Sequence, residues 1–155
     1  MSQQEEKQES EKVKELMAGI QKTMPQEIYQ ELEKNKVVSE TDGTILIGND
    51  KDEPSLRLDF TYENGKLVQF VNKEYGFFHS LPEIVVNEEQ AKQTAQTFAK
   101  VFLNQDVHLK KTTDLSGYDT GDYITFEDDN HNTYLVQLSL NLFLKYNDNQ
   151  FLESL

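Results

Sequence analysis

Carboxylates are the most abundant side chains of this sequence that could do chemistry, and one triplet of residues has the pattern of a nucleophile. Asp119-Thr120-Gly121 matches the triplet of aspartic proteases, in which two carboxylates share a proton and activate water. Those enzymes place the triplet at the end of an apolar strand, facing a second copy. Here Tyr118 and Asp122 flank it in a polar stretch, and the sequence has one copy. We interpret the triplet as a turn, because turns favour Asp, Thr and Gly.

A group of carboxylates crowds two segments on either side of one expected strand. Its members are Asp114, Asp119, Asp122, Glu127, Asp128 and Asp129. Hard cations such as Ca²⁺ bind several such oxygens, but no Asp-x-Asp-x-Asp-Gly run with a following Glu is present. This spacing favours solvated hairpin loops over a calcium site, and we expect no metal and no other cofactor.

The remaining residue types that support catalysis are scarce or absent. His79, His108 and His131 do not pair at the short spacing that zinc ligation from one helix or strand requires. The chain has no cysteine, which excludes disulfides, thiolate nucleophiles and cysteine-bound metals. It also has no phosphate-binding glycine motif and no Gly-x-Ser-x-Gly. We therefore expect a protein that is not an enzyme.

The charge of the chain indicates which partners it can bind. Fifteen Lys and Arg residues face 28 Asp and Glu residues, the formal charge is -13, and Arg57 is the one arginine. Nucleic-acid binding needs clustered Lys and Arg, so we expect no nucleic-acid partner. A basic protein partner or a cation-rich cell envelope fits this charge, and so does a plain role in solubility.

Apolar periodicity predicts the helices that must position any site. Val13, Leu16, Met17, Ile20 and Met24 form one stripe of a helix over about residues 8 to 23. A short second helix follows and carries Ile28, Tyr29 and Leu32. A third helix spans about residues 88 to 104, opens with an Asn87/Gln90 capping box and buries a stripe from Ala91 to Phe102.

The rest of the chain alternates with a period of two. Asn64-Gly65 predicts a hairpin over residues 55 to 72, because both central positions of a type I′ turn need positive φ. Strands are also expected at 44–47, 107–109 and 123–126. One long strand is expected from Tyr134 to Tyr146, with Gln137, Ser139 and Asn141 on its polar face. These patterns predict an α+β fold with helices on one face of an antiparallel sheet.

Length and repeats indicate how this fold is organised. A chain of 155 residues is near the usual size of one domain. We expect a disordered polar leader over residues 1–8 and a single domain over residues 9–150. The hairpin at 55–70 aligns without gaps on residues 123–138, an offset that fits chance similarity and a duplication equally well. A duplication implies a pseudo-repeat over 9–80 and 87–147, as two α-β-β-β units in tandem.

The middle of the chain resembles a known family. The run from Asp59 to Phe70, with its Asn64-Gly65-Lys66-Leu67-Val68 turn, is followed by a Pro82 loop and by a helix that opens with Glu88-Glu89-Gln90-Ala91. This pattern resembles PepSY-like domains over about residues 55 to 140. Such domains occur in Gram-positive envelope proteins and lipoproteins, and they bring no catalytic residues to carry over. The resemblance implies an extracytoplasmic, non-enzymatic binding or regulatory module.

These observations lead to one expected function and one alternative. The expected function is to engage a protein or peptide partner through the sheet face and loops, using Tyr75, Phe77, Phe78, Gln137, Ser139 and Asn141. The alternative is an intracellular acidic inhibitor or immunity protein that occludes a basic enzyme surface. We expect an extracytoplasmic, lipid-anchored location for the first and a cytoplasmic one for the second. No segment of the sequence is apolar enough to span a membrane, so the anchor would lie outside this chain.

Overall fold

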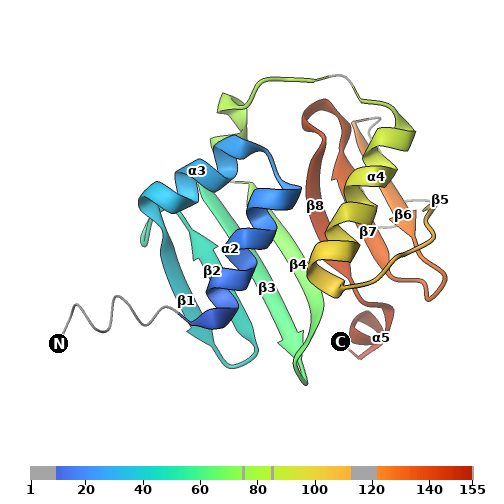
Figure 1. Ribbon diagram of the computed structural model, residues 1–155, viewed down its shortest axis with the longest axis horizontal. Coiled ribbons are helices and arrows are strands. Elements are labelled where there is room, and N and C mark those ends of the chain that lie inside the picture. The colour runs from blue at the N-terminus through green and yellow to red at the C-terminus, as the bar shows by residue number, and fades with distance from the viewer. Residues whose placement is uncertain (1–9, 75, 85, 113–121, 155) are drawn as a thin grey trace.

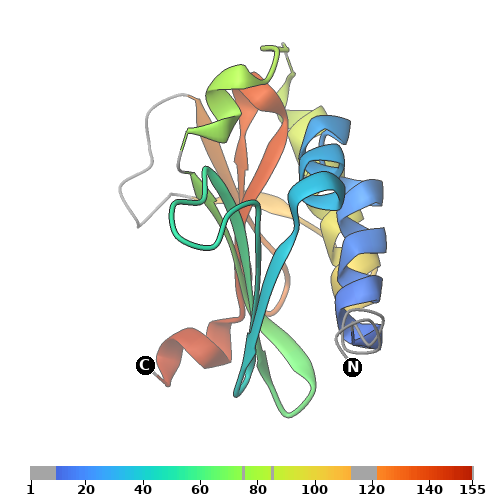
Figure 2. The same cartoon turned by 90° about the vertical axis from the view of Figure 1, so that its left-hand side faces the viewer.

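The helical stripes and the alternating segments form the two layers of an α+β fold. The computed structural model describes residues 10–74, 76–84, 86–112 and 122–154. An eight-stranded antiparallel sheet makes one layer. Helices α2 (Glu11–Thr23), α3 (Gln26–Asn35) and α4 (Glu88–Phe98) cover one of its faces (Figure 1, Figure 2). The predicted fold class, helices on one face of an antiparallel sheet, is confirmed.

Capping residues and a proline determine where the helices begin and end. Ser10 caps α2 by accepting a hydrogen bond from the Val13 N–H at 3.1 Å, and Pro25 separates α2 from α3. The capping box at α4 is present, since Asn87 accepts from the Gln90 N–H and Gln90 accepts from the Asn87 N–H. A π turn (η2, Ala99–Leu103) extends α4 and ends at Asn104, which has a left-handed backbone.

The strands form two meanders that meet at the centre of the sheet (Figure 1). The sheet order is β1-β2-β3-β4-β8-β7-β6-β5, so the last strand of each meander pairs with the other. The 3₁₀ helix η1 (Phe77–Ser80) follows the first meander. The strands are β1 (Val37–Thr41), β2 (Thr44–Gly48), β3 (Leu56–Glu63), β4 (Lys66–Glu74), β5 (Lys110–Thr112), β6 (Tyr123–Glu127), β7 (Thr133–Gln137) and β8 (Leu142–Asn147). The predicted hairpin around Asn64-Gly65 is β3–β4. The strand expected at 107–109 was wrong, because those residues are irregular and β5 begins at Lys110.

The strand pairing also shows how the internal repeat relates to the fold. Each half has its helices first and four strands after them. The ungapped alignment matches β3 and β4 with β6 and β7, while their places in the meanders match β7 and β8. The sequence alignment is therefore displaced by one strand from the structural correspondence between the two meanders.

The sheet register separates an apolar face from a polar one. A row of buried side chains crosses six strands beneath the helices: Ile45, Phe60, Phe70, Tyr146, Tyr134 and Phe126. The adjacent row on the other face holds half-buried polar side chains: Thr44, Thr61, Gln69, Asn147, Thr133 and Glu127. The period of two places these rows on opposite faces, because successive strand residues alternate.

The single strand expected from Tyr134 to Tyr146 was wrong. The segment is a hairpin of β7 and β8, joined by a 3₁₀ turn (η3, Leu138–Leu140) and by Asn141, whose φ is 47°. Alternation continues through the turn, so apolar spacing alone does not reveal it. The strand-only reading of the last third also missed helix α5 (Asn149–Glu153), which lies on the other side of the sheet from α2 (Figure 2).

Candidate functional site

The aromatic loop that we expected to contact a partner packs in part against the core, as far as it is described. The Phe77 side chain is half-buried and packs against the core, and Leu81 is buried. The Phe77 N–H donates to the Ser55 carbonyl at 3.0 Å, which fixes the start of the loop. Tyr75 and the side chain of Phe78 lie outside the described part of the structure.

Two of the polar residues expected on the sheet face are tied to one carboxylate. Asp122 accepts hydrogen bonds from Gln137 Nε2 at 3.0 Å, from the Ser139 N–H at 3.0 Å and from Ser139 Oγ at 2.9 Å. These bonds hold the end of β7 to the start of β6. These donors of Gln137 and Ser139 are therefore already bonded within the fold and are not available to a partner.

Asn141 lies elsewhere, on the helix side of the sheet. Its Oδ1 accepts from Thr94 Oγ1 on α4 at 2.7 Å. Asn141 and Leu81 share a hollow of about 360 Å³ that Met24, Ile84 and Leu140 also line. The structure therefore brings Asn141 close to the end of the expected loop, but separates it from Gln137 and Ser139.

The candidate catalytic and metal residues do not assemble into a centre. Asp114 and the Asp119-Thr120-Gly121 triplet lie outside the described residues. Within the described ranges, no group of three His, Asp or Glu side chains is placed to hold a metal ion. His108 and His131 each lie near one carboxylate, Asp129 at 3.6 Å and Glu127 at 3.5 Å.

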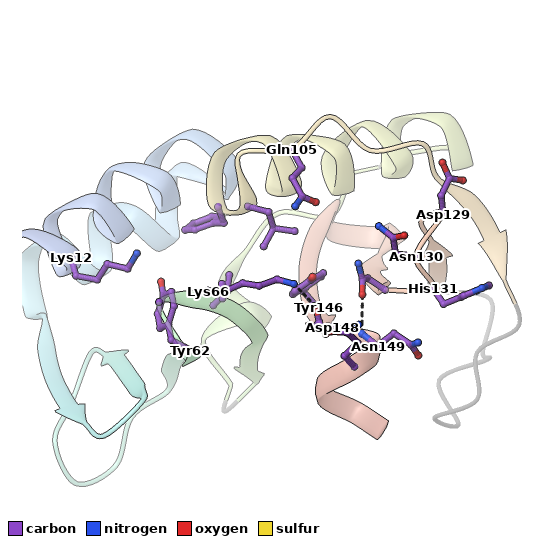
Figure 3. A pocket seen from close by; sticks show the side chains of 16 residues that line it. Lys12, Tyr62, Lys66, Gln105, Asp129, Asn130, His131, Tyr146, Asp148 and Asn149 are labelled. Atoms are coloured by element: carbon purple, nitrogen blue, oxygen red, sulfur yellow. Dashed lines mark hydrogen bonds and ion pairs between the residues drawn. The ribbon is translucent and has the colours of Figure 1, made fainter. Parts of the chain in front are cut away.

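A larger cleft, of about 710 Å³, opens at the end of the molecule where the helix layer meets the sheet (Figure 3). Lys12 of α2 and Tyr62 of β3 lie at one end of it, and Asp129 and His131 at the other (Figure 3). The remaining lining comes from the β3–β4 hairpin, from η2 and the residues after it, from the loop between β6 and β7, and from β8 and the start of α5. These residues are Gly65, Lys66, Leu67, Phe102, Leu103, Gln105, Asn130, Asn132, Tyr146, Asp148, Asn149 and Gln150.

A buried carboxylate fixes the wall of the cleft formed by residues 128–132. Asp128 Oδ1 accepts from the N–H groups of Asn130 and Asn132 at 2.9 and 3.0 Å. Its Oδ2 accepts from Asn132 Nδ2 at 3.0 Å and from Tyr134 Oη at 2.9 Å. Four donors thus hold this loop, which includes His131 at a φ of 66°, in one conformation.

A second carboxylate joins this loop to α5 and the β3–β4 hairpin. Asp148 caps α5 by accepting from the Phe151 N–H at 3.1 Å, and Lys66 Nζ lies 3.0 Å from its Oδ2. Burial raises the pKa of Asp148, but the Lys66 ammonium and the N–H groups at the start of α5 outweigh burial, so the pKa lies below its usual range. Asn132 Oδ1 accepts from the Asn149 N–H at 2.8 Å and completes the connection.

The floor of the cleft is aromatic and extends into the core. Phe102 lies there, 4.9 Å from Phe98 between ring centroids, and Tyr146 is 1% exposed. At the far end, Lys12 Nζ lies 4.6 Å from the centroid of the Tyr62 ring. Burial raises the pKa of Tyr62 and of Tyr146, so both phenols stay protonated at neutral pH.

Several polar groups of this cleft have no partner within the described residues. They are the side-chain amides of Gln105, Asn130 and Gln150 and the hydroxyls of Tyr62 and Tyr146. Tyr146 is the most informative, because a nearly buried hydroxyl normally has a hydrogen-bond partner. A rigid wall with unpaired donors and acceptors is suited to bind a polar ligand without rearranging.

Little in the sequence indicated this cleft, because its residues come from five separate stretches of the chain: 12, 62–67, 102–105, 129–132 and 146–150. The Asn64-Gly65 signal predicted the turn next to Lys66. The carboxylates at 127–129 were interpreted as part of solvated hairpin loops, whereas Asp128 is buried and supports its loop. One signal was available: Asp148 directly after a strand is a typical helix N-cap, and it would have revealed α5.

Comparisons with known proteins add no assignment to this geometry. Neither the protein-family models, nor the curated proteins, nor the solved structures gave a match to this chain. None of the helices in the described part is both long enough and apolar enough to cross a bilayer.

Proposed function

We propose that this chain is a non-enzymatic binding module that holds an extended segment of a peptide or protein in the cleft between Lys12 and Asp129. The observation that carries the proposal is the set of unpaired amides and hydroxyls along a cleft in which Asp128 and Asp148 fix one wall. A side-chain amide donates and accepts as a peptide group does, so Gln105, Asn130 and Gln150 match the main chain of an extended ligand.

The size and polarity of the cleft support a peptide over a compact apolar cofactor. A volume of about 710 Å³ lies within the range of ligand sites, but such sites are usually lined by apolar side chains. Here the polar groups are many and spread along the cleft, while Leu67, Phe102 and Leu103 supply a limited apolar floor. This pattern suits a ligand with regularly spaced polar groups.

We further propose that the module works outside the cytoplasm, in a lipid-anchored envelope protein of the PepSY-like type. The hairpin and helix motifs between residues 59 and 103 support this assignment, as does the acidic charge of -13. Reading the coding sequence upstream of this chain tests it. A signal peptide with a lipid-attachment cysteine is the expected result, and an independent start codon with no such segment would contradict it.

Peptide display tests the binding function. A random peptide library is panned on the wild type and on Asn130→Trp, which fills the cleft while keeping the Asn130 N–H bond to Asp128. The matched control is Gln93→Trp, an exposed position of α4 away from the cleft. We expect selected peptides to bind the wild type and the control, and to lose binding to Asn130→Trp. Equal binding to all three proteins would place the site elsewhere.

A further inference from the structure

Resting on the proposed function, we infer that the bound segment carries a basic side chain, a lysine or arginine, whose cationic head lies on the side of the cleft between Tyr146 and Asp129. The cleft is thus selective for basic peptides. Three observations support this assignment: the carboxylates at the Asp129 end of the cleft, the unpaired hydroxyl of Tyr146 and the apolar residues of the lining.

The lining has two lysines, Lys12 and Lys66, and two carboxylates, Asp129 and Asp148, and its charge is negative at the Asp129 end, which lies away from Lys12 (Figure 3). Lys66 is paired with Asp148 at 3.0 Å, and Lys12 has Glu15 at 3.8 Å. Asp129 is 80% exposed and lies 3.6 Å from His108 Nδ1. Asp128 behind it accepts only from neutral donors. At this end of the cleft, neither Asp128 nor Asp129 has a lysine or arginine partner within the described residues, in a chain whose net charge is -13.

Nearby carboxylates also act on the hydroxyl of Tyr146, which lines the cleft. Burial first, and then the charges of Asp148 and Asp128, raise the pKa of this phenol. Burial disfavours a charge of either sign, whereas the charges of Asp148 and Asp128 disfavour a ligand carboxylate and favour a cation. The oxygen of Tyr146 has free lone pairs, so it accepts from an ammonium or guanidinium group.

The floor of the cleft suits the apolar stem of such a side chain. Leu67, Phe102 and Leu103 line the same cleft as Tyr146. Lysine and arginine bury their methylene stems on apolar surface and keep the charged head among polar groups. A long basic side chain therefore matches the floor and the acidic rim together, whereas a short or acidic one matches neither.

Matched peptides test this inference separately from the proposed function. ¹⁵N-labelled protein is titrated with the blocked tripeptides Ac-Ala-Lys-Ala-NH₂, Ac-Ala-Nle-Ala-NH₂ and Ac-Ala-Glu-Ala-NH₂ (Nle, norleucine), and the amide shifts of the cleft give each Kd. We expect the lysine peptide to bind about three- to tenfold more tightly than the norleucine peptide, with the glutamate peptide weakest. Raising the salt concentration should reduce this ratio.

Variants assign the selectivity to the two residues named. Asp129→Asn and Tyr146→Phe should each reduce the lysine preference, whereas Asp52→Asn changes the net charge by the same amount as Asp129→Asn at a remote exposed site and should leave it unchanged. Equal Kd values for the three peptides, with shifts confined to the cleft, would overturn the inference and leave the proposed function standing. Absence of cleft shifts with every peptide would overturn both.

Discussion

Two tyrosines that face each other in the core offer a matched test of how the cleft wall is held. The ring centroids of Tyr134 and Tyr146 lie 5.1 Å apart, and both side chains are buried. The Tyr134 hydroxyl donates to Asp128 at 2.9 Å, while that of Tyr146 has no partner among the described residues. Replacing each tyrosine with phenylalanine removes one oxygen and leaves the ring packing unchanged.

The two substitutions should differ in cost. A hydrogen bond to a charged group contributes about 1.5–3 kcal/mol, and Asn132 Nδ2 still serves the same Asp128 oxygen, so we expect Tyr134→Phe to lower the free energy of unfolding by about 1–2 kcal/mol. Tyr146→Phe leaves no protein group unpaired, so its change should stay within about 0.5 kcal/mol.

Urea denaturation followed by circular dichroism measures both values. The slope with denaturant should stay constant, so the difference appears in the midpoint. For a chain of this size, 1 kcal/mol corresponds to a shift of about 2–4 °C in Tm, which gives an independent reading. Equal losses from the two substitutions, or a larger loss from Tyr146→Phe, would refute the view that Asp128 fixes the wall while Tyr146 is left for a ligand.

Three further predictions concern the supports of the cleft. The pKa of Asp148 is lowered in the folded state, so Asp148 contributes stability above the unfolded pKa of about 3.9, and this stability is lost as the pH falls through the folded pKa. Lys66→Met removes the ammonium that lowers this pKa, so the loss should begin at a higher pH in Tm measurements from pH 2 to 7. Superimposable pH curves for the variant and the wild type would contradict this. Gly19→Ala places a Cβ 2.8 Å from the Phe102 ring, so overpacking of about 1–3 kcal/mol should exceed the gain of about 1 kcal/mol in helix propensity; a more stable variant in urea would show that the ring moves freely. Phe98→Ala removes a ring stacked 4.0 Å from Phe143 and should cost about 3–5 kcal/mol by the same assay, whereas a cost below 1 kcal/mol would mean that this is not the centre of the core.

Local signals in the sequence predicted most of the elements. The Asn87/Gln90 capping box and the Asn64-Gly65 turn specify their own geometry, because each depends on residues a few positions apart. The stripe from Val13 to Ile20 identified the buried face of α2 for the same reason. The fold class followed from these segments, because the helices and the strands each have one apolar face, and these faces can pack against each other.

The β7–β8 turn and the cleft depended on information that periodicity does not contain. Leu138 and Leu140 keep the alternating pattern through a 3₁₀ turn, and Asn141 adopts the left-handed backbone that ends it. The hydrogen bonds of Ser139 to Asp122 could not be foreseen, because they join residues 17 positions apart across a hairpin. The cleft is likewise a product of the β4–β8 pairing, which brings the β3–β4 turn beside Asp148.

The most direct test of the central claim is an amide shift map with a peptide selected by panning. A surface site on the sheet, the hollow near Ile84 and the cleft involve different residues, so one titration of ¹⁵N-labelled protein separates them. The largest shifts are predicted at Gly65, Gln105, Asn130 and His131, with small changes at Thr61 and Ile84. Shifts centred on Thr61, or on Ile84 and Asn141, would show that the peptide binds outside the cleft and would contradict the account.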